Sequence, residues 1–268
     1  MTTRILCVCL AGAGLIATLQ ADSGGGCPND QARLELNNGV RAFKQAQYAS
    51  AVEHFRSATE LDAGCIAARL YLATAYMQQY IPGAEAAENQ AMATAAKEQF
   101  DKVLERDANN ELALASLASL CFNRKKFDEA TTWYKKLVSV KPDNKEAFYT
   151  MGVIAWTRSW PPIEEARQKL GMKPDDPGPI VNAEIRMAVR VNYLPVIEEG
   201  IGDIDKALAI DSEYDDAMAY LNLLYRAKAD LEDSAPGYRD DIAQADAWFR
   251  KVLDTRKAKA DRPAGQSH

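Results

Sequence analysis

The chain contains almost no histidine: His54 and His268 are the only two among its 268 residues. It also has no glycine-rich phosphate loop, no nucleophile elbow, no Cys-His pairing in a recognisable context and no cluster with metal-ligand spacing. His54 is expected on the outward side of its helix, away from any site. The sequence therefore favours a protein that is not an enzyme and that uses no cofactor and no metal.

An excess of positive charge is also lacking. The chain has 32 Lys and Arg residues against 38 Asp and Glu residues, a formal net charge of −6. Nucleic-acid binding needs a basic surface that neutralises phosphates, so no nucleic-acid partner is expected. Residues 256–259 with Arg262 form a local basic exception, which we interpret as a solvated tail. Helix capping and solvation account for the acidic pairs Glu164-Glu165, Asp175-Asp176, Asp215-Asp216 and Asp240-Asp241.

Long apolar runs are absent except at the start of the chain. A short positive start ending at Arg4 precedes the uncharged apolar run of residues 5–19, and Ala21 supplies a small residue for cleavage. This pattern predicts a signal peptide over residues 1–21 and an exported protein, periplasmic or secreted. An uncleaved anchor is the alternative, although the run is shorter than the ~20 residues that span a bilayer. No stable membrane insertion is expected after cleavage.

A repeated pattern fills the rest of the chain. Residues 111–144 place Ala118 and Ala130 where two helices must touch, followed by Tyr134, Leu137 and Pro142. Each copy reads as two amphipathic helices, and one such pair cannot bury its apolar face alone, so neighbours must stack. After an N-terminal segment over residues 22–31, we expect copies at 32–65, 66–110, 111–144, 145–214 and 215–257, and then a tail over 258–268.

The spacing of these small and apolar residues resembles the tetratricopeptide repeat, a helix–turn–helix unit of this period. The resemblance covers about residues 30 to 257. The chain looks similar to exported bacterial members of the family. It implies an all-α fold: a right-handed superhelical solenoid of about five repeats. Extra residues fall between the two helices of repeats 2, 4 and 5, and they are expected to form one continuous ridge.

The longest insertion covers roughly residues 158–194 of repeat 4. Trp156 and Trp160 mark its entry, and two prolines follow directly. Its pattern predicts a helical stretch over 163–170, a turn over 173–179 and then a helix carrying Arg186 and Arg190. The apolar surface of that last helix predicts that it packs back onto the array, either over the groove or as part of the ridge.

Export gives the cysteines a role. Cys65 closes the first repeat and Cys27 lies five residues before that repeat opens. The chain runs up one helix and down the next, so the two ends of a repeat meet, within reach of an extended segment. A disulfide between Cys27 and Cys65 is expected in an oxidising compartment. Cys121 is expected to act as a small buried apolar residue.

In the tetratricopeptide family the first helix of each repeat lines the concave side, where partners bind. Carried onto this chain, the inward positions form a partner-binding set that mixes aromatic, apolar and amide side chains. The same positions also pack repeats together, which is the alternative for each of them. The set comprises Asn37, Val40, Tyr71, Thr74, Met77, Ser119, Phe122, Tyr149, Val153, Trp156 and Tyr220.

The family's carboxylate clamp is not present. Chaperone-binding members carry lysine, asparagine and arginine at positions that here hold Leu36, Val40, Tyr71, Leu112 and Ser116. A C-terminal carboxylate would find no cation at these positions, so that mode of recognition is not expected.

The leading hypothesis is a non-enzymatic scaffold of the cell envelope that binds a protein or peptide segment in its concave groove. The alternative is an accessory module that binds a sugar or another small molecule near Tyr149, Trp156 and Trp160, at the repeat-4 insertion. Partner identity and oligomeric state are left open by the sequence.

Overall fold

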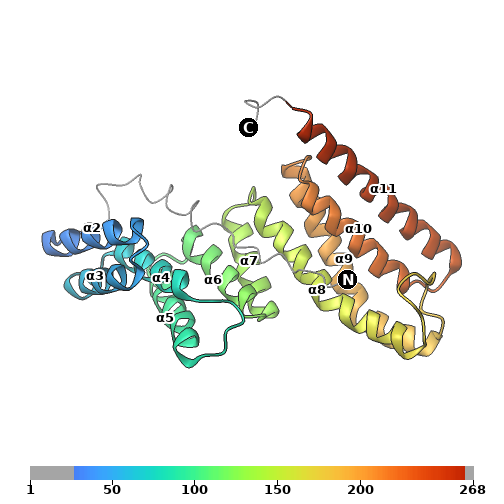
Figure 1. Cartoon of the computed structure of the whole chain (residues 1–268), viewed down its shortest axis with the longest axis horizontal. Coiled ribbons are helices and arrows are strands. Elements are labelled where there is room, and N and C mark those ends of the chain that lie inside the picture. Colours follow the sequence, from blue (N-terminus) through green and yellow to red (C-terminus); the bar gives the residue numbers. More distant parts are fainter. Residues whose placement is uncertain (1–26, 263–268) are drawn as a thin grey trace. The chain divides into compact units, whose positions relative to one another are not determined.

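A computed structural model describes residues 27–262, so the expected signal peptide over residues 1–21 lies outside the described part. The described residues form ten α-helices and no strand (Figure 1). The chain divides into two units, Met1–Trp133 and Tyr134–His268, with the boundary inside one helix. Each unit is described by itself.

The first unit contains two helix pairs and the first part of a third. They are α2 (Asp30–Lys44) with α3 (Tyr48–Leu61), α4 (Ile66–Gln79) with α5 (Ala87–Leu104), and α6 (Glu111–Asn123) with the start of α7 (Phe127–Val140). Asn110 caps α6 by accepting the Ala113 amide at 3.0 Å. Gly39 lets α2 and α3 approach, because a Cβ there would lie 2.5 Å from the Phe55 ring.

The second unit holds repeats 4 and 5. Its helices are α8 (Lys145–Lys169), α9 (Ala183–Ile210), α10 (Asp215–Asp230) and α11 (Ala235–Ala260). Asn144 and Asn182 cap α8 and α9 through their side-chain oxygens. Gly152 permits the close crossing of α8 and α9, since a Cβ there would lie 2.3 Å from Ile204 Cγ1.

The longest insertion has the predicted order of helix, turn and helix. Residues 163–169 are helical, residues 170–182 form the connection, and Arg186 and Arg190 lie on the next helix. The insertion lengthens both helices of repeat 4, so that α8 has 25 residues and α9 has 28. Pro161 and Pro162 lie inside α8, where prolines usually break a helix because they lack an amide hydrogen. The flanking side chains of Ser159 and Ile163 are fully buried, so packing on both sides of the prolines favours continuation of the helix.

The lengthened hairpin of α8 and α9 packs against repeat 5. This agrees with the prediction that the insertion packs back onto the array of repeats. Arg167 of α8 forms an ion pair with Asp230 at the end of α10, with Nη1 and Oδ1 2.5 Å apart. The Ile180 amide donates to the Asp230 carbonyl at 3.0 Å, and the Ile180 side chain is fully buried. The insertions of repeats 4 and 5 therefore lie together. Repeat 2 belongs to the other unit, so a ridge through all three stays a prediction.

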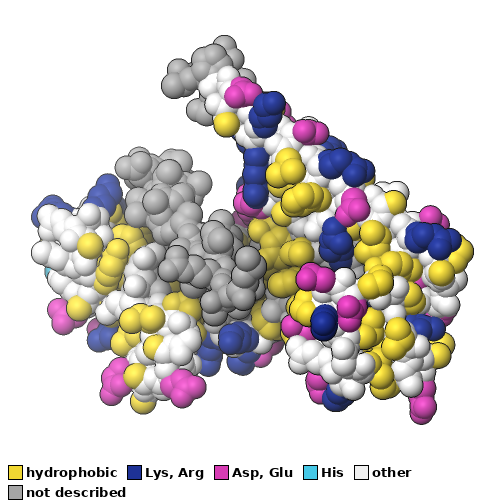
Figure 2. Space-filling model, turned by 45° about the vertical axis from the view of Figure 1, so that its right-hand side comes forward, with side chains coloured by type: hydrophobic (Ala, Val, Ile, Leu, Met, Phe, Trp, Pro, Cys, Tyr) yellow, Lys and Arg dark blue, Asp and Glu magenta, His cyan; other side chains and the backbone are white. Residues whose placement is uncertain are grey.

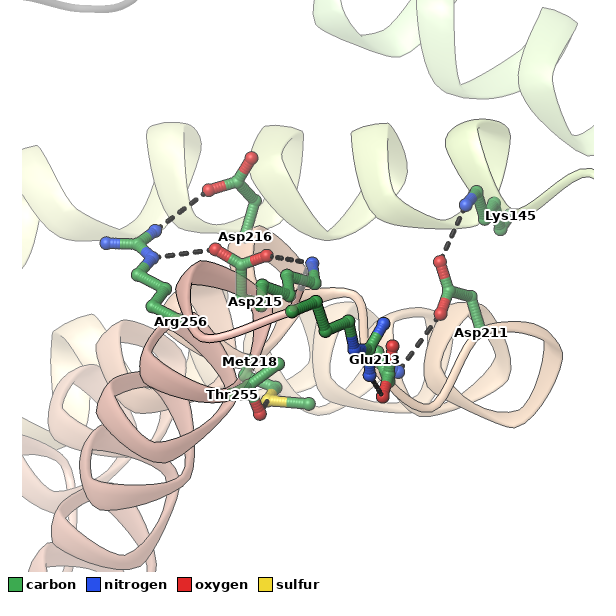
Figure 3. Close-up of polar contacts among 10 residues, drawn as sticks. Lys145, Asp211, Glu213, Asp215, Asp216, Met218, Thr255 and Arg256 are labelled. Carbon is green, nitrogen blue, oxygen red and sulfur yellow. Dashed lines mark hydrogen bonds and ion pairs between the residues drawn. The ribbon is translucent and has the colours of Figure 1, made fainter. Parts of the chain in front are cut away.

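The basic C-terminal stretch is not a solvated tail, and that expectation was wrong. Helix α11 continues to Ala260, and its basic side chains return to the start of α10. Arg256 Nε lies 2.6 Å from Asp215 Oδ2 and Arg256 Nη2 lies 3.0 Å from Asp216 Oδ1 (Figure 3). Lys259 adds a contact with Asp215 at 2.5 Å. Asp215 and Asp216 are the first residues of α10, and they form ion pairs with the basic side chains that the sequence analysis expected to be solvated.

Two smaller features concern the first repeat. Cys27 and Cys65 are joined in a disulfide with Cα atoms 4.6 Å apart, within the usual range for such a bond, and both residues are buried. The His54 side chain is 37% exposed, and its Nδ1 lies 2.7 Å from Glu35 Oε2 on α2.

Cys121 is 3% exposed, and burial raises the pKa of its thiol to about 11. This thiol therefore stays protonated near neutral pH, in keeping with the apolar role expected of it. Within residues 27–262, no helix combines the length and the apolar character needed to cross a membrane.

Candidate functional site

The second unit carries a row of aromatic side chains contributed by two neighbouring repeats. Tyr149, Trp156 and Trp160 lie on α8 at spacings of seven and four residues, so they share one helix face. Tyr220 faces them from α10, and Tyr214 stands immediately before α10. We call these five residues the aromatic row.

Ring contacts run through the whole row. The Tyr149 ring lies 4.9 Å from that of Tyr214 and 5.6 Å from that of Tyr220, measured between centroids. Tyr220 meets Trp156 edge to face at 5.9 Å, and Trp156 stacks on Trp160 at 6.4 Å with an interplanar angle of 11°. All four distances fall in the range of favourable aromatic pairs, so each ring fixes the orientation of the next.

Exposure divides the row into two roles. Tyr149 is 8% exposed, so it belongs mainly to the packing between repeats 4 and 5. Trp156, Trp160 and Tyr220 are half-buried, so their rings are held by neighbours on one side and reach solvent on the other. Half-buried, oriented aromatic side chains are the type that dominates binding energy at interfaces.

Polar contacts fix the Tyr214 end of the row. The Tyr214 hydroxyl donates to Glu146 Oε2 at 2.6 Å, and Lys145 Nζ stands 5.2 Å from the centre of the same ring. Lys145 is itself held by Asp211 Oδ2 at 2.6 Å (Figure 3). Burial, strengthened by the Glu146 carboxylate, raises the pKa of the Tyr214 hydroxyl. This end is therefore a neutral, oriented hydrogen-bond donor.

The same protonation state extends along the row. Burial is the largest cause that raises the pKa of Tyr149, with smaller contributions from Tyr220, Asp216 and Glu146. Burial and the Asp216 carboxylate raise the pKa of Tyr220 in the same direction. All three phenols stay neutral at physiological pH, so the row presents apolar faces with hydroxyl groups rather than charge.

The remaining inward positions of the predicted set are more involved in packing. Val153 is buried beside the row, at 6% exposure. In the first unit Tyr71 stacks on Phe55 at 5.2 Å, and the buried Thr74 hydroxyl donates to the Leu70 carbonyl at 2.8 Å. For these positions the alternative stated above, packing between helices, fits the geometry.

Five more predicted positions are at least partly accessible in the first unit. Val40 and Met77 are half-buried and pack against its hydrophobic core, while Asn37 is exposed on α2. Ser119 and Phe122 are half-buried on α6, and the Phe122 ring lies 6.0 Å from that of Phe127. The structure thus brings Tyr149, Val153, Trp156 and Tyr220 together in the second unit.

The sequence analysis did not identify Tyr214, and it assigned Trp160 only to the alternative sugar or small-molecule site. Tyr214 precedes its helix, so a register built on helix positions does not assign it to the inner face. An aromatic residue directly before the Asp215-Asp216 helix start was the available signal. Trp160 lies one turn beyond the expected end of the repeat helix, and it joins the row only because α8 continues through the prolines.

At least one member of each acidic pair has a partner: Glu165 pairs with Lys169, Asp176 accepts from the Lys173 amide, and Asp215 pairs with Arg256. Lys228 Nζ lies 2.8 Å from Asp241 Oδ1, which ties the start of α11 to α10. Within residues 27–262, no group of three or more His, Cys, Asp or Glu side chains is placed to hold a metal ion.

Comparisons with known proteins agree with the repeat pattern and the helix pairs. Residues 113–144 match the family model described as a tetratricopeptide repeat. No curated protein sequence matches the chain with significant similarity.

Solved structures with the same fold cover most of the chain at low sequence identity. A crystal structure of MamA protein has a TM-score of 0.60 at 15% identity, over 89% of this chain and 99% of that one. MamA from Desulfovibrio magneticus RS-1 has a TM-score of 0.56 at 17% identity, over 87% of this chain and 99% of that one.

A third solved structure is YrrB, described as a tetratricopeptide-repeat protein with an unusual peptide-binding site. It has a TM-score of 0.54 at 13% identity, over 83% of this chain and 85% of that one. At these identities the likeness concerns the fold. Residues 113–144 therefore match the tetratricopeptide family, and the helix pairs of the chain share the fold of these solved structures.

Proposed function

We propose that this protein is an exported, non-enzymatic scaffold of the cell envelope that binds a protein segment along the aromatic row of repeats 4 and 5. The observation that carries the proposal is the continuous chain of ring contacts from Tyr214 to Trp160. Tetratricopeptide repeats generally mediate protein–protein interaction, and helix faces of this kind receive helical or extended peptide segments.

The physical basis is preorganisation. Trp156, Trp160 and Tyr220 each touch another ring of the row, so they lose little rotamer freedom when a partner covers them. Neutral phenols and indoles also give up water at a lower cost than charged side chains. An apolar or aromatic partner residue placed against these three side chains would bury surface that is now in solvent.

The export part of the proposal rests on the N-terminal pattern and is compatible with the disulfide. A bond between Cys27 and Cys65 persists in an oxidising compartment such as the periplasm or the exterior of the cell. Cleavage after Ala21 should leave Asp22 as the first residue of the mature protein. Mass spectrometry of the protein recovered from an envelope fraction checks this, and a retained leader would support a membrane anchor in its place.

The binding experiment compares variants with matched tryptophan substitutions. In the row variant, Trp156→Ala and Trp160→Ala are combined. In the control, Trp248→Ala removes a half-buried tryptophan of α11 whose ring contacts Lys251 rather than the row. Mature wild-type, row and control proteins serve as baits for capture from an envelope extract, and the affinity for each captured partner is then measured with purified components.

Binding and melting measured on the same samples separate the two roles of these residues. The proposal predicts that the row variant melts close to the control but binds the partner at least about tenfold more weakly, since a few central aromatic residues dominate interface energy. Full partner affinity in a folded row variant would exclude the row as the site. A lowered melting temperature with unchanged affinity would assign Trp156 and Trp160 to packing alone.

The second candidate is a sugar or small-molecule site at the same tryptophan pair. The observation in its favour is the near-parallel stacking of Trp156 and Trp160, at 11°, which offers a flat aromatic surface. Intrinsic tryptophan fluorescence titrated with envelope oligosaccharides tests it, with the same row variant as reference. Saturable quenching that is lost in the row variant would favour this candidate over a protein segment.

A further inference from the structure

Helix α11 leaves two large apolar side chains in solvent. Phe249 and Leu253 are each 52% exposed, and their spacing of four residues puts them next to each other on one side of the helix. The adjacent side of α11, with Ala245 and Val252, is buried. In Figure 2, hydrophobic side chains lie along the helix that leads to the C-terminus, with Lys and Arg side chains beside them.

Two ion pairs bracket this apolar pair. Asp246 Oδ1 lies 2.6 Å from Arg226 Nη2, and Arg256 Nη2 lies 3.0 Å from Asp216 Oδ1. Positions 246, 249, 253 and 256 follow the spacing of one helix flank, so Phe249 and Leu253 lie between the two pairs. The interval of ten residues corresponds to about 15 Å of helix, enough to receive roughly three turns of another helix.

The solvent edge of the same flank is basic. Arg239, Arg250 and Lys257 are exposed, and none of the three has an ion-pair partner within residues 27–262. They are separated by eleven and seven residues, whole numbers of helix turns, so they form one edge. This positive edge contrasts with the net charge of −6 for the chain. We call Phe249, Leu253 and these three cations the α11 patch.

We propose that the α11 patch docks an acidic amphipathic helix of a partner protein. Apolar residues of that helix would cover Phe249 and Leu253, and its acidic residues would meet the edge of Arg239, Arg250 and Lys257. Charge argues against a second copy of this chain as the occupant, because two patches placed face to face would oppose basic edges. The patch lies on α11, whereas the aromatic row lies on α8, α10 and the residue before α10, so the two proposals are independent.

Synthetic peptides test the chemistry directly on the mature protein. The probe is a fluorescent helix-forming peptide of about 15 residues with leucines on one face and glutamates beside them. Its twin carries lysine at every glutamate position. The protein variants are Phe249→Ser with Leu253→Ser, and Arg250→Glu with Lys257→Glu. Met187→Ser with Val191→Ser is the control, because these α9 side chains are 50% and 67% exposed.

Fluorescence anisotropy should show binding of the acidic probe to the wild type and to the α9 control, with an affinity that falls as salt is added. The apolar variant should lose at least about tenfold in affinity, as loss of central anchors does. The charge-reversed variant should lose the acidic probe and gain the lysine twin. All substituted residues are exposed, so melting temperatures should stay unchanged.

Three outcomes would overturn the proposal. Equal binding of both peptides to the wild type would show that the charge of the edge plays no role. Unchanged binding of the acidic probe by the apolar variant would place it elsewhere on the chain. Light scattering that shows a dimer of the wild type and a monomer of the apolar variant would identify a second copy as the occupant.

Discussion

Replacing Asp230 with alanine should destabilise the second unit by about 3 to 5 kcal/mol, because the change leaves the buried Arg167 guanidinium without its counter-charge. The two side chains are 7% and 9% exposed, with Nη1 and Oδ1 2.5 Å apart. Arg167 Nη2 also donates to the carbonyls of Lys173 at 3.0 Å and Asp176 at 2.6 Å. These neutral acceptors keep part of the solvation of the cation, which places the expected cost toward the lower end of that range.

Related substitutions sharpen the prediction. Asp230→Asn keeps an oxygen acceptor for Arg167, so it should cost less than Asp230→Ala. Combining Arg167→Leu with Asp230→Leu removes both charges and fills the space with apolar groups, which is often nearly neutral for a buried pair. The cycle should therefore show a coupling energy of at least about 2 kcal/mol between the two positions.

Urea unfolding followed by circular dichroism gives the free energies. Hydrogen exchange of the peptides over residues 167–180 reports whether the hairpin between α8 and α9 loosens first. Lys169→Ala serves as the control, because its ion pair with Glu165 is exposed and should have no measurable effect. A cost below about 1 kcal/mol for Asp230→Ala, or purely additive effects of the two leucine substitutions, would refute the reasoning.

The other predictions concern stability at three further places. Reduction of Cys27–Cys65, which closes a loop with a sequence separation of 38, should lower stability by about 2 to 4 kcal/mol on the chain-entropy model; equal unfolding midpoints with and without reductant would contradict this. Gly152→Ala should cost about 1 to 3 kcal/mol through the clash with the buried Ile204, whereas Gly202→Ala, with open space around its Cβ, should be neutral or stabilising in the same urea titration. Burial raises the pKa of Asp203 above 3.8, so the contribution of the protonated Asp203 to stability is present at low pH and is lost as the pH rises through the raised value. The Asp203→Asn variant should therefore gain stability relative to wild type between about pH 3 and about pH 7. A difference in stability that does not depend on pH would count against this.

Much of the fold was predictable because each repeat specifies itself locally. Small residues such as Gly39 and Ala118 mark the close approaches of paired helices, and the apolar spacing marks their buried faces. Both units accordingly consist of paired helices, and the asparagines before α6, α8 and α9 cap those helices as short-range rules require.

The long hairpin of repeat 4 was harder to predict because tertiary packing overrides a local signal there. Pro161-Pro162 predicts a helix break, yet α8 continues, with Ser159 and Ile163 fully buried on either side. The ion pair of Arg167 with Asp230 joins residues 63 apart in sequence, and no periodic pattern indicates it. Arg256 was likewise read as solvated because its partners open another helix.

The candidate site was predictable only in part, because the helix register identifies inward positions but not their burial. The helix register supplies Tyr149, Trp156 and Tyr220, since these follow from counting positions in the first helix of each repeat. It does not supply Tyr214, which precedes its helix, nor does it say which inward residues are buried. Thr74 and Tyr71 show this difference: they occupy inward positions, but the structure packs them between helices.

Site-specific photo-crosslinking in the living source cell tests the central claim most directly. A benzophenone amino acid is placed at Trp160 in the aromatic row or at Met187 on α9 as the exposed control, and crosslinked products are identified by mass spectrometry. The account predicts a discrete partner protein crosslinked through position 160, absent at 187 and lost when Trp156 is also replaced with alanine. The same partner crosslinked equally at 187, or undiminished without Trp156, would contradict the assignment of the aromatic row as the binding surface.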